Sequence, residues 1–143
     1  MAVYDKRRFY WYKLTYDFFN QDDIKWLEEQ PNGDRCAYFY LKLCAKSILT
    51  NGVLIRDIGN FQVAYTNELL AKATNTDIDI VEQSMRLFEE MGIIKLVNSG
   101  AIFITNLEDM IGEKSVGAFK KEVQKRLRGG KMVENFPPDI DID

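Results

Sequence analysis

The chain contains no histidine, only two cysteines and only three prolines among its 143 residues. Without histidine, it cannot build a histidine-dependent catalytic triad or a histidine-based metal centre. Cys36 and Cys44 lie in a segment expected to be helical, where their spacing corresponds to a rise of about 12 Å, too long for a disulfide within that helix. We therefore expect two free thiols, as is usual in a reducing cytoplasm.

Long apolar runs are missing as well. No stretch approaches the roughly 18 residues of a membrane-spanning helix, and the basic N-terminus lacks the apolar core of a signal peptide. The chain also lacks a phosphate-binding glycine loop, and its adjacent acidic pairs point to different sides of their helices. We therefore predict a cytoplasmic protein with no membrane partner, no cofactor, no metal site and no enzymatic activity.

The net charge of −3 conceals a marked separation of charge along the chain. Residues 114–131 contain seven basic residues and one acidic residue, a local charge of +6 that leaves −9 for the remainder. Such a separation says more about possible partners than the net charge does.

The first half of the sequence predicts two helices and two strands. Phe9–Thr15 is aromatic and alternating, which favours a strand, and Asp22–Gln30 has the acidic first turn of a short helix. After a Pro-Asn-Gly turn, Asp34 is expected to cap a long helix that ends near Thr50. Val53–Ile55 reads as a short strand.

The next segment has the pattern of a helix-turn-helix with a wing. Thr66 is expected to cap a helix over Asn67–Ala73, and Thr76 to cap a second helix over 77–91. Apolar runs then flank Asn98–Gly100, a pattern typical of a β-hairpin. The predicted fold class is therefore α+β and mainly α, a winged helix-turn-helix with a β-hairpin wing.

A basic amphipathic helix is predicted over Ser115–Arg128, followed by a disordered acidic tail. We accordingly divide the chain into a winged-helix domain (1–112), a basic helix (113–131) and a tail (132–143). One face of this helix carries an apolar stripe that is a candidate for self-association: Val116, Phe119, Val123 and Leu127. The opposite face carries a cationic ridge of Lys121, Lys125 and Arg128 that suits DNA phosphates, although a solvated basic face is an equally good explanation.

The second helix of the helix-turn-helix has an unusual charge for a helix that reads DNA. Its outward half holds four acids, Asp79, Glu82, Glu89 and Glu90, beside one base. Base edges are normally read by Arg, Lys, Asn or Gln. The candidate DNA contacts in this region are Gln83 and Arg86, with Thr76 at the helix entry and Lys95 in the wing. A second basic cluster, Lys6, Arg7 and Arg8, adds phosphate contacts or is simply solvated. Insertion of this helix into a groove and a protein-facing role both remain open.

Several long blocks of the sequence resemble one protein family. They are KRRFYWYKLTYDFF, IKWLEEQPNGDRCAYFYLKLCAKSILTNGVL, NELLAKATNTDIDIVEQSMRLFEEMGII and NLEDMIG, in that order. Together they are similar to the N-terminal domain of phage replisome organizers, which is itself similar to the winged-helix domain of DnaD-type primosomal proteins.

The resemblance implies a DNA-replication initiation protein that acts in the bacterial host cell. Such a protein binds double-stranded origin DNA, forms a homo-oligomer and recruits a helicase loader or helicase. Two alternatives are kept beside this expectation. One is an oligomerisation scaffold without sequence-specific DNA binding of its own, and the other is a transcriptional repressor.

Overall fold

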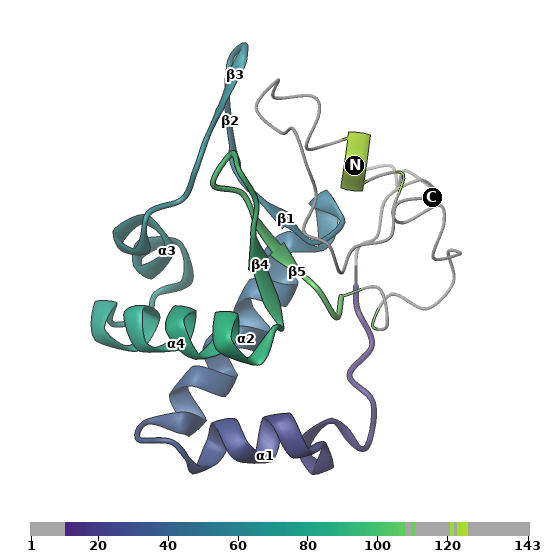
Figure 1. Ribbon diagram of the computed structural model, residues 1–143, viewed down its shortest axis with the longest axis vertical. Helices are drawn as coiled ribbons and strands as arrows, with labels where there is room; N and C mark the ends of the chain where they lie inside the picture. The colour runs from purple at the N-terminus through teal and green to yellow at the C-terminus, as the bar shows by residue number, and fades with distance from the viewer. Residues whose placement is uncertain (1–10, 108–109, 111–120, 122, 126–143) are drawn as a thin grey trace, which may run out of the picture.

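The computed structural model describes residues 11–107, 110, 121 and 123–125 (Figure 1). The elements in chain order are η1 Phe18–Asn20, α1 Asp22–Glu29, α2 Gly33–Ser47, η2 Ile48–Thr50, β1 Val53–Leu54, β2 Arg56–Ile58, β3 Phe61–Val63, α3 Asn67–Thr74, α4 Ile78–Met91, β4 Ile94–Leu96 and β5 Ile102–Ile104. These helices and strands confirm the predicted α+β, mainly helical fold class. None of the described helices has the length and apolar character needed to cross a membrane.

Helix α2 is the centre of the packing. It contacts α1, α3, α4, β1 and β5, and its buried side chains include Phe39, Tyr40 and Leu43. Phe88 of α4 packs between two of them, with ring centroids 6.1 Å from Phe39 and 5.5 Å from Tyr40. On its other side, Tyr40 stacks on Phe18 of η1 at 6.4 Å. Four aromatic rings from three elements thus form one cluster, in which Phe88 holds α4 against α2.

A three-stranded antiparallel sheet contains the predicted hairpin, β4–β5, which we call the wing. β5 lies between β1 and β4, and Ile102 is opposite both Leu54 and Leu96. The predicted hairpin between Ile94 and Ile104 and the predicted strand near Val53 are thus confirmed. Three helices, α2 to α4, together with β1 and this hairpin form an arrangement compatible with a winged helix.

A second hairpin, β2–β3, was not predicted. It pairs Arg56 with Val63 and Ile58 with Phe61, and it turns at Gly59, whose φ of 59° suits a residue without a Cβ. Figure 1 shows it projecting from the helices beyond the wing. Neither of its strands pairs with another strand among the described residues. The sequence predicts no element between β1 and α3.

The first predicted strand, Phe9–Thr15, is wrong for the residues that are described. Residues 11–15 form no strand, and the segment is attached to the core by single contacts instead of a strand ladder. The Tyr12 hydroxyl donates to the Leu41 carbonyl at 3.0 Å, and the Lys13 N–H donates to the Met110 carbonyl. Tyr12 is therefore attached to α2 and not to a sheet.

Two of the predicted helix caps also need correction. The N-cap of α2 is Asn32 in the left-handed region, with Asp34 inside the first turn. The N-cap of α4 is Asp77 and not Thr76, and neither cap makes a side-chain hydrogen bond to its helix. By contrast, Thr66 caps α3 as predicted, with its Oγ1 accepting from the N–H of Leu69 at 3.2 Å.

The C-terminal predictions fall largely outside the described residues. Of the helix predicted over Ser115–Arg128, residues 121 and 123–125 are described and are helical. The acidic tail and the proposed boundaries after residues 112 and 131 lie outside the described part of the chain, so these stay predictions.

The aromatic cluster predicts a large loss of stability for Phe88→Ala. Phe88 is fully buried, and truncating a buried Phe typically costs about 3–5 kcal/mol through lost transfer free energy and the cavity left behind. The matched control is Phe19→Ala, whose side chain is 46% exposed. Urea denaturation of both variants should show a much smaller loss for Phe19→Ala. Equal losses would show that the cluster does not organise the core.

Candidate nucleic-acid interface

The turn between α3 and α4 is fixed by its own threonines and by a lysine from α2. The Thr76 hydroxyl donates to the Thr74 carbonyl at 3.1 Å, and the two threonine hydroxyl oxygens are 2.9 Å apart. Lys42 Nζ donates to the carbonyls of Thr74 at 2.6 Å and Asn75 at 3.4 Å. Thr76, predicted as a DNA contact at the helix entry, is therefore already engaged inside the turn.

Gln83, the second candidate for a base contact, is engaged as well. Its side-chain amide donates to the carbonyl of Pro31, in the turn that joins α1 to α2. That turn is tight, because a Cβ on Gly33 would lie 2.2 Å from the carbonyl oxygen of Leu27. A base contact by Gln83 would first have to break this hydrogen bond.

The remaining outward surface of α4 is acidic in the folded protein. Four acids are exposed there, Asp79, Glu82, Glu89 and Glu90, and the single base, Arg86, is exposed among them. A negative potential over this helix opposes the approach of a phosphate backbone.

A cleft separates α4 from the wing. It has a volume of about 410 Å³, and its walls include the apolar side chains of Met85, Ile94 and Leu96 beside the charged side chains of Glu82 and Arg86. Leu96 is 48% exposed. An apolar floor with a mainly acidic rim suits contact with protein better than contact with the edge of a duplex.

The wing itself offers little positive charge. Lys95 lies in β4 opposite Phe103, is half-buried and already interacts within the chain. The hairpin closes with the Gly100 N–H donating to the Val97 carbonyl at 2.8 Å. No basic residue lies between β4 and β5.

The basic ridge is partly described. Lys121 and Lys125 are exposed, whereas Val123 between them is 1% exposed and belongs to the hydrophobic core. Val123 therefore packs inside the chain instead of lying on its surface. The other predicted contacts lie outside the described residues: Lys6, Arg7, Arg8, Val116, Phe119, Leu127 and Arg128.

A further cationic surface, which the sequence reasoning missed, runs along the outer side of α2. We call it the α2 strip and define it by Arg35, Tyr38, Lys42 and Lys46, which follow one another at helical spacings of three and four. Lys42 Nζ lies 4.5 Å from the centroid of the Tyr38 ring. The spacing was visible in the sequence, but the neighbouring aromatic residues concealed which face of this helix is buried.

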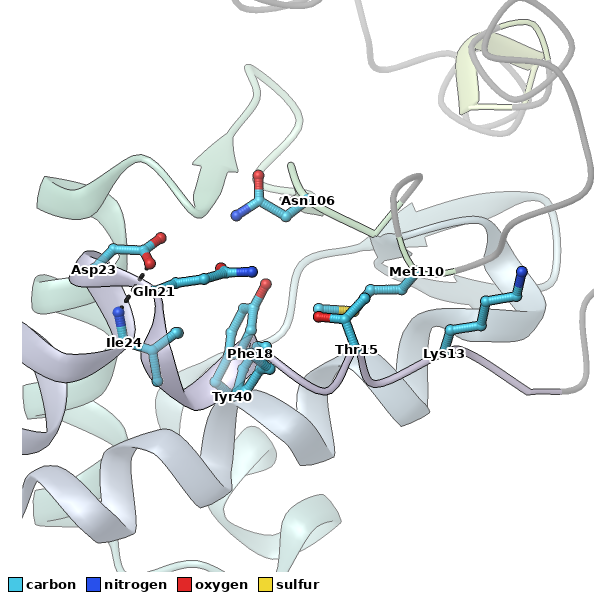
Figure 2. A pocket seen from close by; sticks show the side chains of 9 residues that line it. All are labelled: Lys13, Thr15, Phe18, Gln21, Asp23, Ile24, Tyr40, Asn106 and Met110. Atoms are coloured by element: carbon cyan, nitrogen blue, oxygen red, sulfur yellow. Dashed lines mark hydrogen bonds between the residues drawn. The ribbon is translucent and has the colours of Figure 1, made fainter.

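A polar pocket lies at the junction of the N-terminal segment and α2 (Figure 2). Its volume is about 270 Å³. Figure 2 shows Tyr40 rising into it from α2, with Gln21 and Asn106 near its hydroxyl end. That hydroxyl is buried and has no hydrogen-bond partner among the described residues, and burial raises its pKa. The pocket has room for water molecules that would satisfy the hydroxyl.

The two cysteines are free thiols, as predicted, and both are buried. Burial raises the pKa of the Cys44 thiol to about 12, so this group stays protonated near neutral pH. Among the described residues, no three Cys, Asp or Glu side chains gather closely enough to hold a metal ion. The expectation that the protein is not an enzyme stays a prediction.

The comparisons with known proteins give one match. A family model described as the N-terminal phage replisome organiser matches residues 11–132, which is most of the chain. No curated protein and no solved structure matches.

Proposed function

Because the chain belongs to the N-terminal phage replisome organiser family, we propose that it acts in phage replication initiation by binding double-stranded origin DNA and by associating with further copies of itself. Recruitment of a helicase loader or helicase is the third part of this proposal. The family membership supports the replication role. The charge distribution on the folded protein supports the proposal that DNA is held through its phosphates.

The observation that carries the DNA-binding proposal is the arrangement of residues 121–125. Val123 is buried, and the two lysines that flank it are exposed one helical turn apart. An apolar side chain thus fixes the segment against the protein while two ammonium groups face solvent. Phosphates are held by cations placed in this way, and such contacts position a protein on DNA without reading sequence.

Sequence preference is the finer part of the proposal. Among the predicted base contacts, Arg86 is the exposed one, whereas Thr76 and Gln83 hydrogen bond within the chain. Because Arg86 stands alone among four exposed acids, we propose that phosphate contacts supply the affinity and that the outer face of α4 makes no base contact. The acidic remainder of α4 and the cleft beside it are left for a protein partner, for which the loader or helicase is the proposed candidate.

Self-association is proposed to use the β2–β3 hairpin. Ile58 is 43% exposed and its cross-strand partner Phe61 is 56% exposed, so an apolar pair lies near the tip of a projecting hairpin. A two-stranded sheet is marginal by itself, and its open edges invite pairing with another chain. A second copy offers the same apolar pair and the same edges, which is what a two-fold symmetric contact requires.

Reversing the two described ridge lysines tests the DNA-binding proposal. The double variant Lys121→Glu, Lys125→Glu should bind origin duplex at least 10-fold more weakly, because two phosphate contacts become repulsive. The slope of log K against log salt should fall by about 2, since each phosphate contact contributes roughly 0.9. Fluorescence anisotropy over a salt series measures both quantities.

The matched control for this test is Lys13→Glu, Lys25→Glu, which makes the same charge change at two exposed lysines outside the ridge. An equal loss in both variants would mean that only net charge matters. Unchanged affinity in the ridge variant would remove the ridge from the DNA interface.

Replacing the apolar pair of the hairpin tests self-association. The double variant Ile58→Ser, Phe61→Ser should shift the protein towards monomer, because the proposed contact loses its apolar area. The control Leu14→Ser, Leu49→Ser changes two exposed apolar residues outside the hairpin and should leave the mass in solution unaltered. Sedimentation velocity at several concentrations reads out the mass. An oligomer that survives in the hairpin variant would place the contact elsewhere.

A further inference from the structure

We propose that the α2 strip is a second nucleic-acid site, which binds single-stranded DNA by stacking a base on Tyr38 and holding phosphates with the exposed cations Arg35 and Lys46. This site goes beyond the proposed duplex binding, which uses residues 121–125. It rests on the proposed function in one respect: a role in replication initiation would bring the protein to single strands, which arise where an origin is opened.

The strip presents one continuous cationic face. At 100° per residue, its four side chains fall within about a quarter of the helical circumference, and the distance along the axis from Arg35 to Lys46 is about 16 Å. Asp34, in the first turn, is the only acidic residue of α2. Asp77 of the adjacent α4 N-cap lies 3.8 Å from Arg35, but both side chains are largely exposed, so this pair is weak.

Aromatic rings interleave with these cations. Tyr38 is 60% exposed, and the ammonium group of Lys42 over its ring restrains the ring orientation. Lys42 is itself held by the carbonyls at the end of α3. The ring is therefore presented on a rigid part of the fold and loses little conformational freedom when a base stacks on it.

The cationic face continues beyond α2 towards the β2–β3 hairpin. The Tyr65 ring lies 5.4 Å from Lys46 Nζ and 5.9 Å from the Arg56 guanidinium carbon. The Arg56 Nε is buried without a hydrogen-bond partner among the described residues, although another of its nitrogens donates to the Ala64 carbonyl at 3.4 Å. Two cations near one ring extend the path that a phosphate backbone would follow.

The combination of exposed ring and cations favours a single strand over a duplex. A duplex hides the faces of its bases within the stack, so Tyr38 would gain nothing from it beyond nearby phosphates. A single strand exposes both its phosphates and its base faces, and stacking on aromatic side chains is a main source of affinity for such strands. An acidic peptide would satisfy the cations but would leave the ring without a stacking partner.

The test compares two oligomers of the same length, about 16 nucleotides. One is single-stranded oligo-dT, and the other has the same sugar-phosphate backbone without bases. The full chain should bind oligo-dT more tightly than the abasic oligomer in fluorescence anisotropy. Tyr38→Ala should lower the oligo-dT affinity by about 5- to 100-fold and remove the difference between the two oligomers, because base–aromatic stacking is lost.

Matched variants separate stacking from other effects. Tyr16→Ala removes another tyrosine, 97% exposed and outside the strip, and should leave oligo-dT affinity unchanged. Tyr38→Phe keeps the ring and should retain binding. Lys46→Glu should weaken binding of both oligomers, whereas Lys25→Glu, on α1, should not. Circular dichroism checks that each variant folds.

The outcomes distinguish this site from the proposed duplex site. Oligo-dT binding that persists in Lys121→Glu, Lys125→Glu while duplex binding is lost would support a separate strip. Equal affinity of the full chain for the two oligomers would overturn it, as would a Tyr38→Ala variant that binds oligo-dT like the unaltered protein. If duplex binding is intact in either of those cases, the proposed function stands and only the strip fails.

Discussion

The contact of Phe88 with Phe39 and Tyr40 is the constraint on which the other features depend. It holds α4 against one side of α2, and this arrangement decides which surfaces of both helices remain outside. Because the apolar half of α4 is used in that contact, its acidic half must face outward. Because α2 buries two of its sides, against α1 and against α4 and the sheet, one narrow face remains, and that face carries the cations.

The result is a domain in which charge of opposite sign lies on different helices. The helix that would read DNA in an ordinary helix-turn-helix is electronegative and borders a cleft with an apolar floor. Positive side chains lie on α2 and near residues 121–125. This division suits a protein of replication initiation, in which one surface holds nucleic acid while another remains available for protein contacts. It is also compatible with the proposed DNA binding by a chain whose net charge is −3.

The sequence predicted the features that depend on local signals. Thr66 and the apolar runs around Asn98–Gly100 mark a helix start and a turn by short-range chemistry, so α3 and the wing were placed correctly. The β2–β3 hairpin was missed because each of its strands has three residues, which is too short to show a clear alternation of apolar and polar residues. The bond from Gln83 to Pro31 joins residues far apart in the chain, and no local pattern shows it. The α2 strip was also missed. Aromatic residues stand at adjacent positions of this helix, so the sequence pattern does not show which face of the helix is buried.

Nucleic acid is proposed to meet the cationic surfaces of this domain and not the outer face of α4. Backbone amide NMR spectra, recorded while origin duplex and oligo-dT are added separately, test it most directly. The account predicts that duplex shifts the signals of residues 121–125, that oligo-dT shifts those of Arg35 to Lys46, and that Asp79 to Glu90 remain nearly unchanged with both. Dominant shifts from Glu82 to Arg86, with Lys121 and Tyr38 unaffected, would contradict it.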